Sequence, residues 1–556
     1  MKPPEYNLLD EPWVPVRLLD GTITEVGLLE LLQRSTDIAD LACELPTQNI
    51  AIQRLVLAVA YRVATPLDAE EWLEQLEEGA PIEQMIEYLE KWRERFYLFG
   101  GQYPFMQVAD LRTPKDTVSG LEKLIADVPN GEQFFTTRNG KALERISAAE
   151  AARWVVHTQA YDPSGIRSGA VGDPEVKGGK GYPIGPAWCG QLGLVWLKGK
   201  NFNETLLLNL VPADAGDLKG VPVTTEWDWC TWEVSTPETS ARGNYSRLDP
   251  KGTPRDLSIP KLLTWHSRRI KLIGDSSGVT SVVLAQGDKL APQQMQRYEP
   301  QSLWRYSLPQ SRNHKQDVYM PSKFKAGRAL WRDLPGTLPV CEMITGADKQ
   351  PKREFLQSAV LSFHAELKSS MLAEDYPTQM QIQAVGVTYG PQEATVDDIY
   401  ADELTLSVAM MRAEREDLAA EVDRQVRLTE QVAVRVGMLG ANLARAAGES
   451  GDRAGDGARD RAKEQFFSRI DDPFRAWLAQ VDGRLNAREV GQIWASELRR
   501  YATELGEQLV ASASSSAIIG RDTSWGFMNV SIAENFFRSA LQKLMPNPDN
   551  KQEGMK

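Results

Sequence analysis

The chain has 556 residues, more than one hydrophobic core usually supports, so two to four domains are expected. Its 42% hydrophobic and 25% charged residues exclude a chain that is disordered overall, and no apolar run reaches 18 residues. The amino terminus lacks a basic head followed by an apolar stretch, so we expect a cytoplasmic protein without signal peptide or membrane contact.

The net charge of −13 argues against a free-standing nucleic-acid binder, but the charge is unevenly distributed. Residues 68–90 carry acids and no base, whereas residues 297–332 are rich in Lys and Arg. The basic stretch also contains Tyr298, Trp304, Tyr306, Tyr319, Phe324 and Trp331. This mixture is typical of surfaces that contact both phosphates and bases. A half-buried strand pair with one solvated face gives the same mixture, and the sequence leaves both interpretations open.

The first hundred residues mix short strands and helices. The pattern predicts a short strand within 6–17, a strand and then a helix over 22–34, and a buried helix over 49–63. Residues 68–90 follow as an amphipathic acidic helix, whose carboxylates we interpret as a solvated face.

Two loops stand out before residue 190. Residues 157–185, called here the glycine-rich stretch, hold seven glycines with Arg167, Lys177 and Lys180 among them. Free backbone amides beside lysines suit a phosphate or a nucleic-acid backbone, although an ordinary long surface loop has the same composition. Residues 133–140, QFFTTRNG, could stack on a base and hold its edges, or could anchor an ordinary turn.

The middle third predicts mixed α and β structure, and the last third predicts helices. Residues 192–212 are expected to form a strand, a turn and then a helix or a second strand. Short strands are expected in 279–290 and 337–345. From about Arg353 the pattern turns helical, with one very long helical run over 402–447. Three further helical segments follow, at 461–482, 487–513 and 528–545. Together they predict an antiparallel four-helix bundle, with the domain boundary near 395–402.

Motifs of catalysis are missing. The four histidines, at 157, 266, 314 and 364, form no HExxH, and there is no GxSxG and no GxGxxG after a strand. The Gly178–Gly181 segment lacks the Ser or Thr that would follow a phosphate-loop lysine. The four cysteines lie far apart and are interpreted as reduced core thiols. We therefore expect a protein that is not an enzyme.

Five features follow one another along the chain in a specific order. They are NLLDEPWVPVR at 7–17, FYLFGGQYPFMQ at 96–107, the glycine-rich stretch, LLLNLVP at 206–212 and the helical carboxy-terminal third. In this order they resemble the CasA family, the large subunit of the type I-E CRISPR surveillance complex Cascade. The resemblance covers essentially the whole chain.

This resemblance implies an α+β protein with a mixed α/β domain, 1–398, followed by a four-helix bundle, 399–556. It implies a non-enzymatic subunit at the 5′ end of the CRISPR RNA. Its partners would be the other Cascade subunits, namely the backbone subunits and the small subunits. Such a subunit recognises the protospacer-adjacent motif of double-stranded DNA, largely from the minor groove. It then promotes strand separation and R-loop formation and recruits the helicase-nuclease.

The resemblance also assigns residues. A glycine loop falls on Asp162 to Gly169, so that Ser164 and Gly165 would face the minor groove. A lysine that reaches into the groove falls near Lys315 in NHKQDV. A glutamine wedge falls in YGPQEAT and comprises Gln392, Glu393 and Ala394. The segment that contacts the RNA 5′ end and a neighbouring subunit comprises Phe135, Thr136 and Thr137.

Two features depart from the family pattern. Some members carry a four-cysteine zinc site, but the matching region at 268–283 has no cysteine, so we expect no metal and no cofactor. The wedge also carries an acid, Glu393, that phosphates would repel. A purely structural scaffold subunit, without DNA reading, is the alternative, and it would leave the two loops without a role.

Overall fold

The computed structural model describes residues 5–128, 136, 138, 143–213, 215, 229–233, 257–338, 343–367, 376–481, 483–524 and 526–546. The chain divides into two compact units. Unit 1 comprises residues 1–330, 341–376 and 380–403, and unit 2 comprises residues 331–340, 377–379 and 404–556. The predicted boundary between residues 398 and 399 falls inside a strand that runs from Val396 to Ser407.

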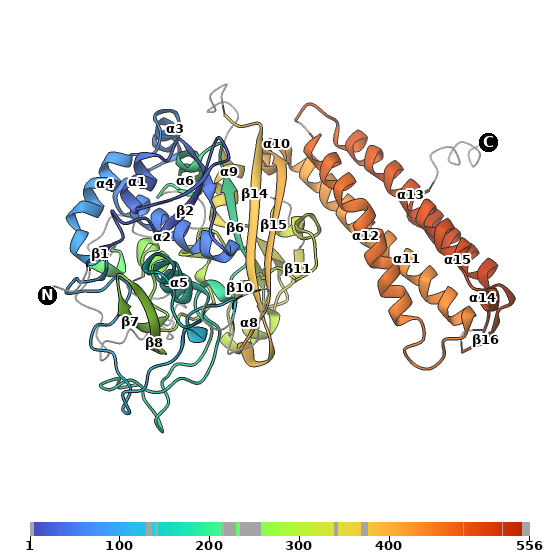
Figure 1. Cartoon of the computed structure of the whole chain (residues 1–556). Helices are drawn as coiled ribbons and strands as arrows, with labels where there is room; N and C mark the ends of the chain where they lie inside the picture. Colours follow the sequence, from blue (N-terminus) through green and yellow to red (C-terminus); the bar gives the residue numbers. More distant parts are fainter. Residues whose placement is uncertain are drawn as a thin grey trace. The chain divides into compact units, whose positions relative to one another are not determined.

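Unit 1 is built around one buried helix, α2 (Pro46–Ala64), which packs against helices on several sides (Figure 1). Its buried Arg54 makes a two-pronged ion pair with the carboxylate of Glu299, at 2.8 Å for each nitrogen–oxygen pair. The other helices of unit 1 are α1 (Leu28–Gln33), α3 (Ala69–Glu78), α4 (Ile82–Lys91), α5 (Ala148–Tyr161), α6 (Phe202–Asn209), α7 (Ile259–Leu263), α8 (Leu308–His314) and α9 (Ala359–Glu366). Within the described residues no single helix has the length and hydrophobicity to cross a bilayer; α2 and α3 meet that criterion only as a pair bent by 116°.

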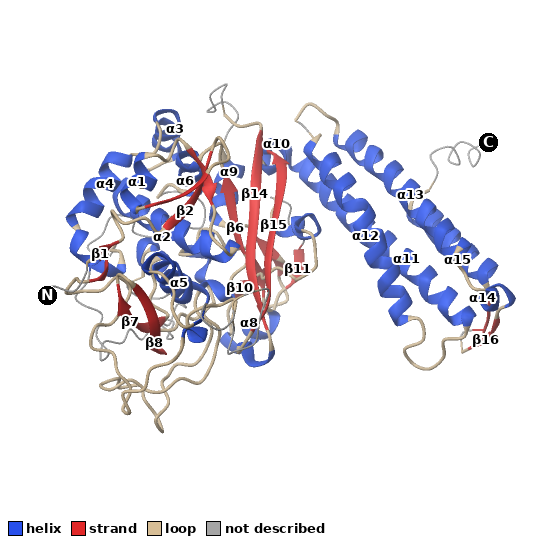
Figure 2. Cartoon of the chain, in the orientation of Figure 1, coloured by secondary structure: helices blue, strands red, loops and turns tan. Residues whose placement is uncertain are grey.

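The strands of unit 1 form several small sheets instead of one large one. Three-stranded sheets have the orders β3–β2–β4, β10–β9–β13 and β15–β14–β6, and β7 pairs with β8 as a ribbon (Figure 2). The strands are β1 (Tyr6–Asn7), β2 (Val14–Leu18), β3 (Ile23–Val26), β4 (Ile38–Leu41), β5 (Tyr97–Phe99), β6 (Leu194–Lys198), β7 (Arg268–Asp275), β8 (Gly278–Gln286), β9 (Trp304–Tyr306), β10 (Tyr319–Pro321), β11 (Met343–Thr345), β12 (Pro351–Arg353), β13 (Phe355–Leu356), β14 (Gln379–Tyr389) and β15 (Val396–Ser407).

Unit 2 contains a bundle of four long helices. These are α11 (Glu416–Ala447), α12 (Asp456–Ala479), α13 (Ala487–Ala511) and α15 (Val530–Leu544), and α11 contacts each of the other three. The shorter elements of unit 2 are α10 (Val408–Met411), α14 (Ser515–Ile519), β16 (Arg521–Thr523) and β17 (Gly526–Met528). The predicted fold class, a mixed α and β region followed by a helical bundle, is confirmed.

Two expectations about the elements are wrong. Helical character was expected from about Arg353, but α9 is short and β14 and β15 occupy most of residues 379–407. Residues 402–407 therefore end a strand, and the long helix begins only at Glu416. The acidic segment 68–90 is two helices, since Gly79, with φ of 96°, and Pro81 end the first and begin the second.

Candidate nucleic-acid interface

The glycine-rich stretch begins inside a helix. Helix α5 starts at Ala148 and is capped by Ser147, whose hydroxyl accepts a hydrogen bond from the backbone N–H of Glu150 at 3.1 Å. It continues to Tyr161, so His157 to Tyr161 are helical and the loop itself starts at Asp162. Burial lowers the pKa of His157 to about 3, and its Nε2 lies 2.9 Å from the hydroxyl of Thr47. A buried neutral imidazole of this kind is a structural group.

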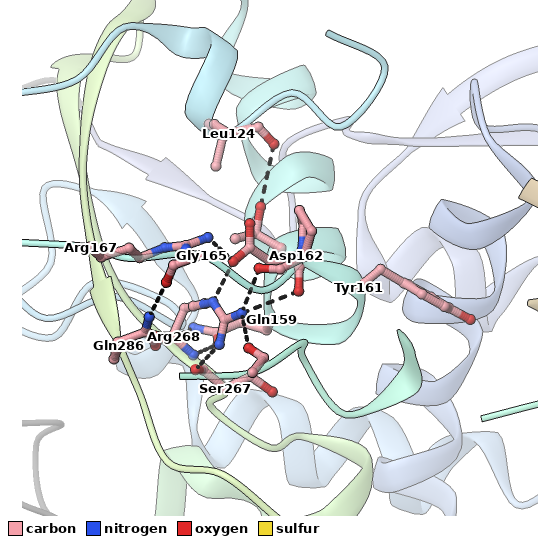
Figure 3. Close-up of polar contacts among 12 residues, drawn as sticks. Leu124, Gln159, Tyr161, Asp162, Gly165, Arg167, Ser267, Arg268 and Gln286 are labelled. Atoms are coloured by element: carbon pink, nitrogen blue, oxygen red, sulfur yellow. Dashed lines mark hydrogen bonds and ion pairs between the residues drawn. The ribbon is translucent and has the colours of Figure 1, made fainter. Parts of the chain in front are cut away.

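One arginine holds both ends of the loop. Arg268 is the first residue of β7, and its Nε donates to the carboxylate of Asp162 (Figure 3). Nη2 of Arg167 donates to the same carboxylate. The Arg268 guanidinium also donates to the backbone carbonyls of Pro163 at 3.0 Å and Gly185 at 2.8 Å. The carboxylate is 7% exposed and the Arg268 side chain 3%. Charge-assisted bonds in such a dry setting fix the loop firmly on the sheet.

Two glutamines complete the anchoring (Figure 3). Gln159 of α5 pairs with the backbone of Arg268 through bonds of 2.9 Å and 3.0 Å. Gln286 of β8 donates to the carbonyl of Gly165 at 2.7 Å. A Cβ at Gly165 would lie 3.3 Å from Arg167 Nη1, so any larger residue there must displace the guanidinium. The predicted reading loop is therefore a rigid piece of backbone.

The second glycine cluster, Lys177 to Gly181, supports the first. The backbone N–H of Gly169 donates to Gly179 at 2.9 Å, and that of Gly181 donates to Arg167 at 3.0 Å. Gly178 and Gly179 have φ of 57° and 75°, the left-handed conformation that glycine adopts at little cost. The resemblance assigned this cluster no role, and the structure shows it as a turn paired with the glycine loop.

The predicted wedge lies at the tip of the β14–β15 hairpin. Its turn, residues 390–395, is closed by a bond from the N–H of Gly390 to the carbonyl of Thr395 at 3.0 Å. Gln392 and Glu393 have φ of 58° and 57°, which costs non-glycine residues about 1–2 kcal/mol each. Both side chains are exposed, whereas Ala394 is half-buried. This backbone presents Gln392 to solvent on a strained turn.

The hairpin turn and the glycine loop are bonded to each other. The backbone N–H of Ser164 donates to the carbonyl of Glu393 at 2.8 Å. The phenol of Tyr389 donates to the carbonyl of Tyr161 at 2.6 Å, and burial raises its pKa so that it keeps its proton. Ser164, Gly165 and Ala394 line one common cavity of 380 Å³. Two segments that the sequence singled out separately thus form one surface.

Comparison with known proteins identifies the family. Residues 7–505 match the family model described as CRISPR-associated protein Cse1. The chain belongs to the Cse1 family. A CRISPR-associated protein CasA/Cse1 of Thermus thermophilus is 26% identical over 522 residues, which cover 90% of this chain and 91% of that protein.

Solved structures agree with this assignment. The crystal structure of Thermobifida fusca Cse1 is 36% identical, covers 97% of this chain and 98% of its own, and superimposes with a TM-score of 0.86. A chain in a structure described as a CRISPR RNA-guided surveillance complex is 18% identical over 97% of this chain and all of its own length. Its TM-score of 0.64 shows a shared fold.

Lys315 of this Cse1-family chain lies at the carboxy-terminal end of α8, with φ of 54° and an exposed side chain. The structure also places another lysine, Lys323, beside the hairpin turn. Its Nζ is 3.8 Å from Glu393 Oε1 and 5.6 Å from the centre of the Tyr389 ring. Sequence reasoning counted Lys323 within the basic stretch but had no signal for which of those bases reaches the turn.

The aromatic residues of the basic stretch belong mainly to the core. Trp304 and Trp331 are fully buried, and Tyr298, Tyr306 and Phe324 are at most 9% exposed. Arg305, on the strand between Trp304 and Tyr306, is exposed. The strand pair β9–β10 accounts for Trp304, Tyr306 and Tyr319, and the five buried rings are not available to stack on bases. Contact of the basic side chains with phosphates stays a prediction.

Part of the predicted RNA segment can be located. Phe135 and Thr137 lie outside the described residues. The hydroxyl of Thr136 accepts a bond from the backbone N–H of Arg138 at 3.1 Å. Arg138 in turn pairs with three carboxylates, those of Glu44, Asp127 and Glu150, at 2.6 to 3.3 Å. Within the described residues no group of three or more His, Cys, Asp or Glu side chains is placed to hold a metal.

Proposed function

We propose that this chain is the large subunit of a type I-E CRISPR RNA-guided surveillance complex. In it, the chain recognises the protospacer-adjacent motif of double-stranded DNA from the minor groove. It then promotes strand separation and R-loop formation, and it recruits the helicase-nuclease. It acts without a cofactor and is not itself an enzyme. Membership of the Cse1 family and the fold shared with a chain of such a complex support assembly with CRISPR RNA and other subunits.

The observation that carries the proposal is the bond between Ser164 N–H and the Glu393 carbonyl. The minor groove offers a degenerate set of acceptors, which backbone groups and one long cation can sense without demanding a single sequence. A side chain inserted beneath the motif must offset a few kcal/mol of unstacking per base step. Because the reading loop and the wedge turn are bonded together, recognition of the motif would position Gln392 for strand separation.

The charges of the chain indicate where the binding affinity comes from. With a net charge of −13, the isolated chain repels DNA at long range, so the complex must supply most of the phosphate contacts. Locally, Lys323 lies within 3.8 Å of Glu393 and offsets the acid at the wedge. The chain would then act as a selective gate on DNA that the complex already holds.

The test uses a reconstituted RNA-guided complex, with and without this chain, on duplexes that differ only in the adjacent motif. Motif discrimination is expected only when the chain is present. Gln392→Ala with Glu393→Ala should slow strand separation about tenfold or more, because a few kcal/mol of unstacking are no longer offset. Lys315→Ala should weaken motif discrimination, whereas Lys543→Ala, an exposed lysine of α15, should not.

The contrary results are equally clear. If the double variant separates strands at the rate of the unchanged complex, the chain is a structural scaffold without a wedge. If discrimination persists when the chain is left out, motif reading belongs to another subunit.

A further inference from the structure

The cavity of 380 Å³ is lined in part by Ser164, Gly165 and Ala394, but the proposed motif reading gives its interior no ligand. One wall is residues 162–168 of the loop, and a second is the segment that carries Glu122 to Ala126. Val283 and Leu284 of β8 and Val396 of β15 complete it. Pockets that enclose small organic ligands have volumes of roughly 300 Å³ and above, so this one is large enough for one nucleotide.

The loop wall of the cavity carries a buried ionic cluster. The single carboxylate of Asp162 faces two guanidinium groups, those of Arg167 and Arg268. Burial lowers the pKa of Arg167 to about 10, so it remains a cation at neutral pH. Arg268 does not line the cavity, and its guanidinium also donates to the carbonyls of Pro163 and Gly185. Arg167 is therefore the guanidinium of the cluster that lines the cavity, where Lys123 is the other cation and Asp162 and Glu122 are the anions.

Arg167 also has an unused donor. Its Nη2 is bonded to Asp162, but its Nε is buried and has no hydrogen-bond partner in the structure. Buried guanidinium nitrogens are normally paired, so an orphan beside a cavity indicates a missing acceptor. Arginine presents its nitrogens in a fork that matches the oxygens of a phosphate.

The remaining lining suits the rest of a nucleotide. Pro163 and Ile166, which is 67% exposed, offer an apolar surface of the kind on which a base packs. Hydroxyl groups on Thr117, Ser119 and Ser168 supply donors and acceptors for a sugar or a base edge. The cavity thus combines a guanidinium that can bind an anion with an apolar surface and several hydroxyl groups.

We propose that this cavity binds one unpaired nucleotide, with its phosphate on Arg167 and its base against Pro163 and Ile166. The assignment to a nucleotide, in preference to another organic phosphate, rests on the proposed function. The ligand could be a nucleotide of the guide RNA or of a separated DNA strand, since the two share this chemistry. Binding to the cavity does not require motif reading, so the two proposals can fail separately.

The test titrates the isolated full-length chain with adenosine and deoxyadenosine 5′-monophosphates by calorimetry at physiological salt. We expect saturable binding of one nucleotide per chain. Deoxyadenosine and inorganic phosphate alone should each bind at least about tenfold more weakly, because each lacks half of the contacts. Tighter binding of the ribonucleotide would indicate the RNA as the source, and tighter binding of the deoxyribonucleotide would indicate the separated strand.

Three variants locate the site. Arg167→Gln should weaken nucleotide binding about tenfold, the usual loss for a charge-assisted bond. Ala126→Phe fills the cavity from the wall opposite the loop, leaves the Asp162 ion pairs in place and should abolish binding. Arg145→Gln, an exposed arginine bonded to Ser277, is the matched control and should change nothing.

The proposal is overturned if neither nucleotide binds saturably at millimolar concentration, or if Ala126→Phe binds as well as the unchanged chain. It is also overturned if inorganic phosphate binds as tightly as the nucleotides, since the cavity would then be a simple anion site. Loss of motif discrimination in the complex, with nucleotide binding intact, would count against the proposed function and not against the cavity.

Discussion

The candidate interface and the helical bundle are held together by different forces. In the interface, Asp162, Arg167 and Arg268 form a buried ionic cluster that fixes backbone without regular structure. In the bundle, the core is aromatic and apolar. The centre of the Phe474 ring lies 4.1 Å from the centre of the Trp331 ring and 4.8 Å from that of the Trp494 ring. Burial of apolar surface stabilises the bundle, whereas the interface is stable only while its buried acid and arginines stay ionised and paired.

The polar groups of the two regions differ in the same way. In the bundle, Trp494 Nε1 donates to the hydroxyl of Thr429 at 2.9 Å, and neither group changes charge at ordinary pH. Unit 1, by contrast, contains all four histidines, of which His157 and His364 are buried and His266 is half-buried. The two units should therefore respond differently to pH and to substitution.

The largest expected difference is in the response to acid. Burial lowers the pKa of His157 and His266 to about 3 and that of His364 to about 4, from the usual 6.5. Below pH 6.5 the three histidines bind protons in the unfolded chain but stay neutral in folded unit 1. The free energy of unfolding that is present above pH 6.5 is therefore lost as the pH falls towards 4. Each histidine lowers the free energy of unfolding by about 1.4 kcal/mol per pH unit in this range, and the three together lower it by about 4 kcal/mol per pH unit.

Scanning calorimetry between pH 7 and pH 5 checks this. The transition of unit 1 should move to lower temperature much more than that of the bundle. His157→Gln should reduce the slope by about a third, and His314→Gln, whose side chain is exposed, serves as the control. Equal shifts of the two transitions would mean that buried histidines do not distinguish the units.

The second prediction tests the apolar side of the comparison. Phe474→Ala removes a fully buried ring that packs on Trp331, Trp477 and Trp494. The free energy of unfolding of the bundle should fall by about 3–5 kcal/mol. Denaturant titration followed by tryptophan fluorescence measures it. Val434→Ala, which trims a side chain 43% exposed, should cost less than about 0.5 kcal/mol. Similar losses in both variants would contradict a well-packed core.

The third prediction tests the ionic side. Arg268→Met keeps the length of the side chain but leaves the carbonyls of Pro163 and Gly185 without a donor. Asp162 retains Arg167, so the expected loss is about 2–3 kcal/mol and not the full cost of an unpaired buried charge. Denaturant titration measures this loss, and faster proteolysis within 162–185 should accompany it. Lys271→Met on the same strand is the control; an equal loss there would show that Arg268 has no special role.

The sequence predicted the bundle better than the sheets, for a physical reason. Helices repeat their apolar face every three or four residues, so α12, α13 and α15 could be located from local spacing alone. Strand β14 alternates its buried residues at Met380, Ile382 and Ala384, a period of two that is too short to outweigh the helical pattern around it. Register and pairing of that strand depend on β6, almost 190 residues earlier in the chain.

The site was predictable only in pieces. The glycines of residues 157–185 are visible in the sequence, whereas the narrower loop 162–169 and the glutamine wedge in YGPQEAT came from the family resemblance. The bond from Ser164 to Glu393, the clamp by Arg268 and the approach of Lys323 each join segments far apart in the chain. Such contacts leave no periodic signal in a single sequence.

The smallest expected effect separates strain from function at the hairpin turn. Gln392 has φ of 58°, so Gln392→Gly relieves left-handed strain and should change the stability of unit 1 by about 1 kcal/mol or less. Gln392→Ala keeps the strain, and both variants remove the wedge. If the side chain of Gln392 separates strands, both should slow R-loop formation in the reconstituted complex to the same extent, whatever their melting temperatures. If only the glycine variant is slow, rigid backbone at the turn matters, and the side chain is not the wedge.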